Sequence, residues 1–491
     1  MRNGMFFRKI VVAVLGQGIG LLYEFLIMVF AGRLLGADDY GKVLYVYTLL
    51  SICMIITKFG FEGCIVSYVA RNDIGPEKKR WIVLLCLGVS LAVSICMIIL
   101  IHVLKPFMIV LMGAGSDNYD VLRTMSPIIV LETMGILLSS VIKGRKETFR
   151  YYVVYMHMQY GIRLMSFIIL WYLFGIRNIF SLIISYYLSC FSMILVAFIF
   201  LRETHIISGI KEKESLHSVF MISIPLMLSS AITVLNSQID QYMIGYYLNN
   251  AVLAIYSMAL NIGRVSSFAL IAVNSIFAPT ISECYYSGMK ERLKNLYIKT
   301  TKWVTCFNML ILGVFSICSR DIMMLVGEEY SSGATVIIII LLGEVVNSSV
   351  GAVGYLNSMT GKAVNVFASN LIAVVMNIIL NMYLIPSYGI AGAAIASAIS
   401  VITCNLLLFY FMYRHLKMIP FTRNYVGIIV AFLGAFLLTI SIHNFCVLSG
   451  VYIIVVCSLV FCFVFGVIAY FLIIESDERQ YIKRLISGGA K

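Results

Sequence analysis

Long apolar stretches recur along this chain and constrain its fold more than any other feature. Fourteen of them reach about 20 residues, enough for an α-helix to cross the hydrocarbon core of a bilayer. Only 12% of the 491 residues are charged, about half the share that is usual in soluble domains. The sequence therefore predicts an all-α polytopic membrane protein with 14 transmembrane helices, near residues 10–31, 43–62, 82–104, 125–142, 151–173, 179–201, 218–244, 251–280, 303–325, 334–358, 364–384, 390–413, 425–444 and 451–474.

Lysine and arginine are distributed unevenly between the connections of these stretches. If the N-terminus is cytoplasmic, 27 of the 36 basic residues fall in inside segments and six in outside loops. The remaining three, Lys58, Arg163 and Arg264, fall within spans. Because basic loops stay cytoplasmic during insertion, this bias predicts that both termini are cytoplasmic. Topology also explains most of the net charge of +13, so no nucleic-acid partner is expected.

Similar short motifs recur at matching places in the two halves of the chain. The polar stretch "GRLLGADDYGKVLYVY" begins at Gly32, and "GYYLNNAVLAIYS" begins at Gly245, 213 residues later. Six helices per repeat is an even number, so two such lobes run parallel in the membrane. We therefore predict an N-lobe at 1–205, a C-lobe with a preceding cytoplasmic linker at 206–417, and two further helices with a cytoplasmic tail at 418–491.

Signatures of catalysis, nucleotide binding and metal binding are weak or missing in the sequence. The stretch "VVAVLGQGIG" resembles a dinucleotide fingerprint, but its third glycine comes one place early and it lies inside a predicted span. The six histidines are scattered, and the 12 cysteines include no CxxC pair. We expect a protein that is not an enzyme and that carries no metal or cofactor.

Polar side chains inside the spans form stripes at helical spacing. A charge at mid-bilayer costs about 2.5–3.5 kcal/mol on insertion scales, so such residues usually face protein or a water-filled cavity. Arginine suits a phosphate-bearing substrate because its planar fork holds two oxygens at once. The candidate substrate-binding residues are Arg163, Arg264, Lys58, Gln159, Asn261 and Asn236. The candidates for coupling transport to Na⁺ or H⁺ are the acidic residues Glu24, Asp240, Glu132 and Glu344.

Each of these residues also has a purely structural interpretation. Polar stripes can hold helices together by hydrogen bonds, each worth about 0.6 kcal/mol. Lys58 and Glu62 lie near the cytoplasmic end of a span, where long side chains can reach the interface. Glu132 and Glu344 could simply neutralise the arginines.

Three motifs resemble polysaccharide flippases of the multidrug/oligosaccharidyl-lipid/polysaccharide (MOP) exporter superfamily. They are "FAGRLLGADDYGKVLYVYTL", "DQYMIGYYLNNAVLAIYSMALNIGRV" from Asp240 to Val265, and "NIILNMYLIPSYGIAGAAIASAIS" from Asn377 to Ser400. The resemblance implies a MATE-like fold of two six-helix lobes. It also implies transport of undecaprenyl-diphosphate-linked oligosaccharide across the bacterial inner membrane by alternating access, alongside the polysaccharide polymerase machinery.

Two other functions remain open at this stage. A cation-coupled multidrug antiporter of the same superfamily would be expected to have twelve spans and an acid-dominated site. A polytopic sugar polymerase or ligase would typically need a substantial outer loop, and the longest predicted one covers only residues 105–124. The two extra spans and the buried arginines favour the flippase, which would serve the synthesis of a surface polysaccharide such as O-antigen.

Overall fold

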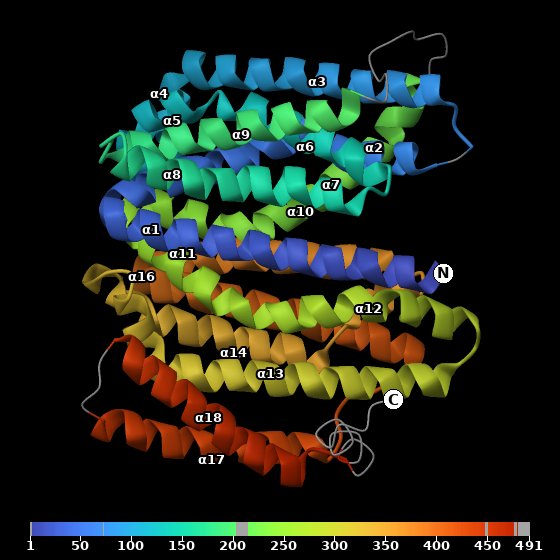
Figure 1. The fold of residues 1–491 in the computed structure, drawn as a ribbon, viewed down its shortest axis with the longest axis vertical. Helices are drawn as coiled ribbons and strands as arrows, with labels where there is room; N and C mark the ends of the chain where they lie inside the picture. The colour runs from blue at the N-terminus through green and yellow to red at the C-terminus, as the bar shows by residue number, and fades with distance from the viewer. Residues whose placement is uncertain (1, 72, 203–214, 447–449, 476–478, 480–491) are drawn as a thin grey trace. The chain divides into compact units, whose positions relative to one another are not determined.

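The computed structural model describes residues 2–71, 73–202, 215–446, 450–475 and 479, which form helices without any strand (Figure 1). The α-helices up to residue 263 are α1 (Arg2–Lys58), α2 (Phe61–Ala70), α3 (Pro76–Val103), α4 (Lys105–Met112), α5 (Tyr119–Met125), α6 (Ile128–Gly144), α7 (Thr148–Tyr152), α8 (Ile162–Tyr172), α9 (Ile179–Arg202), α10 (Leu216–Tyr247) and α11 (Asn250–Gly263). Those that follow are α12 (Ser267–Tyr286), α13 (Lys290–Met324), α14 (Ala334–Val350), α15 (Val353–Met359), α16 (Ala363–Leu416), α17 (Asn424–Phe445) and α18 (Val451–Leu472). Short segments of other helix types are the 3-10 turns η1 (Gly113–Asn118), η3 (Arg264–Ser266) and η4 (Glu328–Gly333), and the π-helix η2 (Val153–Gly161).

Two of the longest helices are interrupted by a glycine with non-helical backbone angles. In α1 the break is at Gly36, with φ 79° and ψ 169°, and in α16 it is at Gly389, with φ 58° and ψ −136°. Both φ values lie in the region that glycine enters at little cost. The first break falls inside the polar stretch 32–41 and the second between two predicted spans, so both occur where the sequence predicts connections.

The number of membrane-spanning helices can be compared with the sequence prediction. Within the described residues, 11 helices are long and apolar enough to cross a membrane, or 12 if the bent pair Gly115–Met125 and Ile128–Gly144 is one span. Two of these, Gly16–Lys58 and Ala363–Leu416, contain the glycine breaks. Dividing them there would bring the count to the predicted 14, which stays a prediction.

Contacts divide the chain into two compact units, unit 1 at residues 1–255 and unit 2 at 256–491. In unit 1, α6 packs against α2, α3 and α9, and α1 packs along α10 (Figure 1). Helix α10, the first predicted helix of the C-lobe, thus belongs to unit 1 in this structure. The predicted linker before it lies mostly at 203–214, outside the described residues. The lobe boundaries at 205 and 417, which follow from the repeat, stay a prediction.

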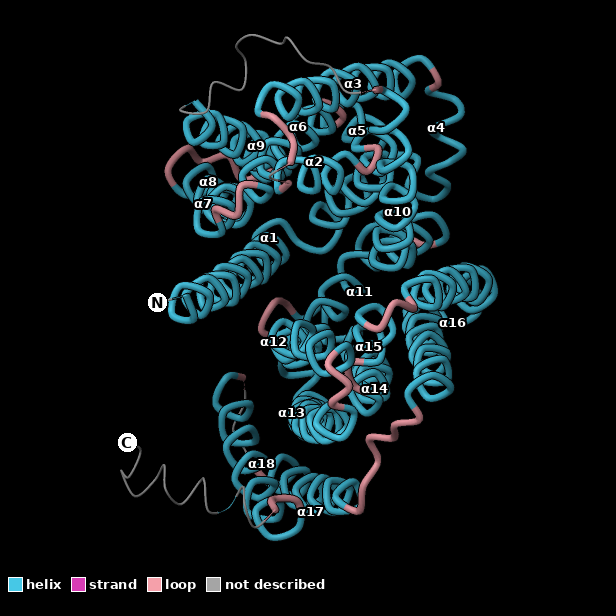
Figure 2. The backbone as a smooth tube through the Cα atoms, turned by 90° about the vertical axis from the view of Figure 1, so that its right-hand side faces the viewer, coloured by secondary structure: helices cyan, strands magenta, loops and turns pink. Residues whose placement is uncertain are grey.

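In unit 2 the helix α13 packs against α14, α17 and α18, and Figure 2 looks almost along its axis. Two polar contacts connect α13 with α17 and with the residues after α18. His443 of α17 pairs with Asp321 at a nitrogen–oxygen distance of 3.0 Å, and Lys302 lies 3.6 Å from Glu475, just beyond α18. Between these pairs, Phe461 of α18 packs in a cluster of buried apolar residues with α13 and α17. The C-terminal helices are therefore an integral part of unit 2.

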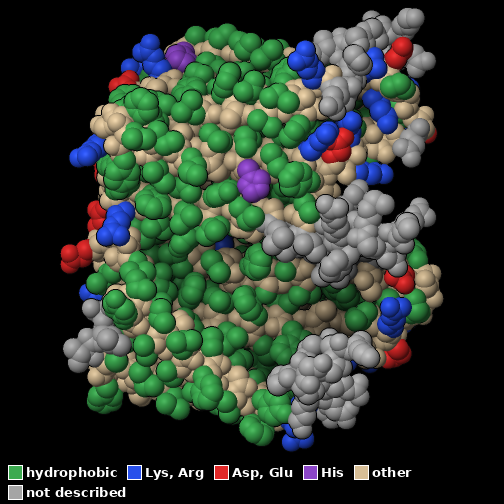
Figure 3. All heavy atoms as spheres, in the orientation of Figure 1, with side chains coloured by type: hydrophobic (Ala, Val, Ile, Leu, Met, Phe, Trp, Pro, Cys, Tyr) green, Lys and Arg blue, Asp and Glu red, His purple; other side chains and the backbone are tan. Residues whose placement is uncertain are grey.

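The surface of the helices is apolar over most of their length. In the face drawn in Figure 3, hydrophobic side chains cover the middle, and charged side chains gather mainly along the left and right edges. Many large apolar side chains are exposed, including Leu173, Phe463 and Tyr383. An exposed apolar band of this extent marks contact with a membrane. The chain is a multi-pass membrane protein.

Candidate functional site

Three of the predicted site residues meet in the interior of unit 1. Glu132 on α6, Gln159 on the π-helix η2 and Arg163 on α8 are only 3%, 2% and 4% exposed. The amide Nε2 of Gln159 donates a hydrogen bond to Oε1 of Glu132 over 2.9 Å. The sequence interpretation placed Gln159 with the substrate and Glu132 with the coupling ion. The structure places both in one polar centre, which we call the Glu132 centre: Tyr47, Glu132, Gln159, Arg163 and Tyr186.

Tyr47 of α1 supplies a second hydrogen bond to this carboxylate. Its hydroxyl donates to the same Oε1 of Glu132 over 2.8 Å. A buried carboxylate needs such donors because burying an unpaired charge is very costly. Sequence reasoning missed Tyr47, which lies among the apolar and aromatic residues of "LYVYTLL". The sequence did offer one indication, because Tyr47 is an aromatic residue that carries a hydroxyl group inside a predicted span.

Arg163 is held mainly by aromatic rings. Its guanidinium carbon lies 3.7 Å from the ring centre of Tyr186, 5.6 Å from that of Tyr160 and 5.8 Å from that of Tyr47. Cations over aromatic faces gain about 0.5–2 kcal/mol, most when they are removed from water. Its Nε also donates a long hydrogen bond of 3.5 Å to Ser189 Oγ. Arg163 is thus enclosed within unit 1.

The backbone around Gln159 is wider than an α-helix. Residues Val153–Gly161 form a π-helix, and α8 continues from it with Arg163 in its first turn. π-Helical turns are rare and occur frequently at functional sites. Because the π-helix changes the angle between successive side chains, the helical spacing predicted for the polar residues of this span does not hold over residues 153–161.

A second polar group of unit 1 lies where α1 ends and α2 begins. Lys58 Nζ is 3.8 Å from Glu62 Oε2, and Ser230 of α10 donates to Glu62 Oε1 over 3.2 Å. Lys58 therefore lies beside a carboxylate, and this group links α2 to α10.

The remaining candidates of unit 1 lie on α1 and α10. Glu24, on α1, has an exposed side chain. On α10, Asp240 is only 4% exposed, whereas Asn236 is exposed. Glu24 and Asp240, the acidic candidates on the first predicted helix of each lobe, therefore lie in different environments.

The candidates of unit 2 surround the junction of α11 and α12. Glu344 of α14 accepts hydrogen bonds through Oε2 from Ser267 Oγ, over 2.9 Å, and from Asn347 Nδ2, over 3.0 Å. Asn261 near the end of α11 and Arg264 at the start of the 3-10 turn η3 are half-buried. The Glu344 carboxylate is half-buried too. The structure therefore places these polar side chains near a break between two helices.

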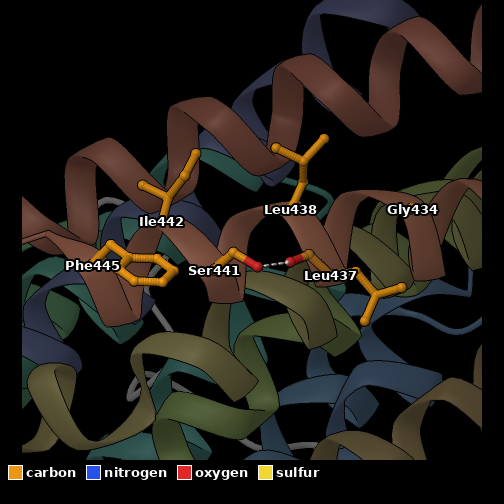
Figure 4. Close-up of a pocket in the computed structure, with 6 residues that line it drawn as sticks. All are labelled: Gly434, Leu437, Leu438, Ser441, Ile442 and Phe445. Atoms are coloured by element: carbon orange, nitrogen blue, oxygen red, sulfur yellow. Dashed lines mark hydrogen bonds between the residues drawn. The ribbon is translucent and has the colours of Figure 1, made fainter.

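An apolar depression lies on the surface of α17 (Figure 4). Its polar lining group is the hydroxyl of Ser441, which donates to the backbone oxygen of Leu437 over 2.8 Å within the same helix. The depression therefore offers a contact surface for apolar chains and no site for a charged ligand. Its lining residues are Gly434, Leu437, Leu438, Ser441, Ile442 and Phe445.

Comparisons with known families identify two matches. Residues 6–285 match the family model described as polysaccharide biosynthesis protein, and residues 225–383 match the MatE model. A capsular polysaccharide biosynthesis protein, CapF of Staphylococcus aureus, is 25% identical over 206 residues, which cover 40% of this chain and 50% of CapF. A probable low-salt glycan biosynthesis flippase, Agl15 of Haloferax volcanii, is 28% identical over 169 residues, covering 33% of this chain and 35% of Agl15. The matches thus span half or less of these relatives.

Two solved structures share the fold at low sequence identity. A lipid II flippase, MurJ, in an inward closed conformation superimposes with a TM-score of 0.75 at 14% identity, covering 95% of this chain and 98% of MurJ. An inward-facing multidrug resistance MATE family transporter of the MOP superfamily gives a TM-score of 0.65 at 14% identity, covering 81% and 94%. The fold is therefore MATE-like. Among proteins of this fold, the chain belongs to the polysaccharide biosynthesis protein family.

Proposed function

We propose that this protein is a flippase that moves undecaprenyl-diphosphate-linked oligosaccharide from the cytoplasmic to the outer leaflet by alternating access. The match of residues 6–285 to the polysaccharide biosynthesis family carries the proposal. The MurJ-like fold and the glycan-related relatives support it. We also propose a bacterial inner-membrane location with both termini cytoplasmic, and a surface polysaccharide as the final product, made with a polymerase that accepts the flipped unit.

Charge and burial support different roles in transport for the basic and the acidic candidates. Arg264 and Asn261 are half-buried at a helix junction, so they are better placed than the enclosed Arg163 to reach a diphosphate or a sugar. Lys58 is partly exposed at the end of α1. We propose that the acidic residues couple transport to a cation, Na⁺ or H⁺.

Deletion of the gene in its host tests the flippase directly. We expect diphosphate-linked oligosaccharide to accumulate on the cytoplasmic side and surface polysaccharide to be lost. The wild-type gene should restore both, and Arg264→Ala should restore neither while Arg264→Lys restores part. Normal surface glycan and normal lipid intermediates in the deletion strain would overturn the proposal.

A cation-coupled multidrug antiporter is the second candidate. The match of residues 225–383 to the MatE model and the fold of a multidrug MATE transporter favour it. In that case the deletion strain would become more sensitive to cationic dyes, and its lipid-linked glycans would be unchanged. The same strain thus separates the two functions.

A further inference from the structure

Three buried atoms of the Glu132 centre have no hydrogen-bond partner within the described part of the chain. They are Oε2 of Glu132, Oε1 of Gln159 and Nη2 of Arg163. Leaving a buried polar atom unpaired is unfavourable, and more so when it carries charge. Native proteins pair such groups with protein or with ordered water in the great majority of cases. Three such atoms in one centre therefore point to a ligand.

Contacts among these side chains place the three groups in one neighbourhood. Gln159 Nε2 is bonded to Glu132 Oε1 over 2.9 Å, so the unpaired oxygens belong to two groups that already touch. Arg163 lies two residues beyond the end of the π-helix that carries Gln159. The hydroxyl of Tyr47 bonds to Glu132, and the ring of Tyr47 lies 5.8 Å from the Arg163 guanidinium carbon.

The chemistry of these atoms selects the ligand. Arg163 Nη2 is a donor, whereas the Glu132 and Gln159 oxygens are acceptors. A metal cation would have only two oxygen ligands here and would be repelled by the positive charge of Arg163. Within the described residues, no three His, Cys, Asp or Glu side chains are arranged to hold a metal ion. An anion would face both oxygens. A water molecule can accept from Arg163 Nη2 and donate to both oxygens, so it can pair all three atoms.

We propose that the Glu132 centre binds one water molecule, which accepts from Arg163 Nη2 and donates to Glu132 Oε2 and Gln159 Oε1. Buried waters typically make about three hydrogen bonds to otherwise unpaired polar groups. A sugar hydroxyl offers the same chemistry, but Glu132, Gln159 and Arg163 are at most 4% exposed, so a sugar ring does not reach them in this conformation. The link between Arg163 and Glu132 is thus mediated by water.

This hydration site has a consequence for coupling, which rests on the proposed flippase function. Water transfers protons, and the donor Arg163 repels metal ions from the same position. A coupling ion that acts at Glu132 is therefore a proton. Flipping by the wild type should depend on pH at constant Na⁺, and Glu132→Gln should lose that dependence. A requirement for Na⁺ that Glu132→Gln abolishes would overturn this assignment.

A structure at a resolution that orders waters tests the site without any transport measurement. Two samples of the full chain, one in Na⁺ and one in K⁺ buffer, should show the same density peak about 2.7–3.2 Å from the three atoms. Direct pairing of the guanidinium with Glu132 and no peak would overturn the proposal. A peak present in Na⁺ and lost in K⁺ would also overturn it, in favour of a metal site.

Thermal unfolding gives a second readout with a matched control. Gln159→Met and Arg163→Lys each disturb the water. The double variant should therefore lose less melting temperature than the sum of the losses in the two single variants. Gln238→Met is the control, because Gln238 on α10 also has a buried unpaired Oε1, and its loss should add to that of Arg163→Lys. Additive losses for Gln159 and Arg163 would contradict the shared water. If instead lipid intermediates prove normal in the deletion strain, the flippase proposal fails while these two tests still decide the hydration site.

Discussion

Two carboxylates, Glu132 of unit 1 and Glu344 of unit 2, are separated in sequence by nearly the predicted repeat distance, and they are held differently. Glu132 and Glu344 are 212 residues apart, close to the 213 that separate Gly32 from Gly245. Glu132 is enclosed and receives hydrogen bonds from α1 and from the π-helix. Glu344 is half-buried and receives one bond from its own helix and one from Ser267. The carboxylate of unit 1 thus lies in a closed centre, and that of unit 2 is more accessible.

Replacing the candidate arginine of each unit, Arg163 or Arg264, should give the largest difference in stability between the two units. Arg163→Met leaves Glu132 as an uncompensated buried charge, and we expect a loss of about 3–5 kcal/mol in the free energy of unfolding. Arg264→Met, at a half-buried position, should cost clearly less. Denaturant unfolding of the purified protein in detergent measures both. The double variant Glu132→Gln/Arg163→Met should recover part of the lost stability. Equal losses for Arg163→Met and Arg264→Met would contradict the difference between the two units.

Removal of one donor from each carboxylate should give a smaller difference. Tyr47→Phe deletes a hydrogen bond to an enclosed carboxylate, with an expected loss of about 1–3 kcal/mol. Ser267→Ala deletes a bond to a carboxylate that water can reach, so its loss should stay below about 1 kcal/mol. The same unfolding experiment ranks them. A larger effect for Ser267→Ala would show that Glu344 is the more enclosed group.

Chemical accessibility sharpens the comparison without depending on stability. In a background without native cysteines, Glu344→Cys should react with a water-soluble maleimide several-fold faster than Glu132→Cys, because a half-buried thiol meets the reagent more often. Labelling rates measured by mass spectrometry give the ratio. Exposed Glu24→Cys serves as the fast reference. Equal slow rates at 132 and 344 would mean that both centres are closed.

Partly exposed ion pairs should show the smallest effects in either unit. Lys58→Gln in unit 1 and His443→Gln in unit 2 each remove one partner of a pair in contact with solvent. Such pairs are worth about 0–1 kcal/mol, so both variants should unfold close to the wild type. Raising the salt concentration should reduce any remaining difference in stability between these variants and the wild type. A loss above about 2 kcal/mol at Lys58 would indicate a role beyond the ion pair.

Hydrophobicity and charge predicted the helical membrane fold because the bilayer restricts each span to a long apolar helix. The break at Gly36 was predicted by its polar setting, and the helices on either side follow from apolar length alone. Lys302 shows the limit of this reasoning. It was counted with the basic inside connections, yet it lies within α13 and is buried beside Glu475, because the long helix continues past the apolar stretch.

Glu132, Gln159 and Arg163 were recognised as unusual because each is polar within a span. Their meeting could not be predicted, since it depends on how α6, η2 and α8 pack. Tyr47 and Tyr186 escaped notice because aromatic residues are common in every span, and only their hydroxyl and ring positions mark them. The π-helix has no periodic signature in the sequence, so the face on which Gln159 lies was also beyond prediction.

The π-helix has a mechanical consequence for the segment that carries Gln159. A wide turn of this kind stores extra backbone length inside a continuous helix. If the wide turn slides along the helix, each residue it passes rotates by about 100°, the angle per residue of an α-helix. Helix ends need not move for this to happen. A sliding turn in segment 153–161 would thus rotate side chains without displacing the helix ends, and deleting one of its residues would remove the wide turn.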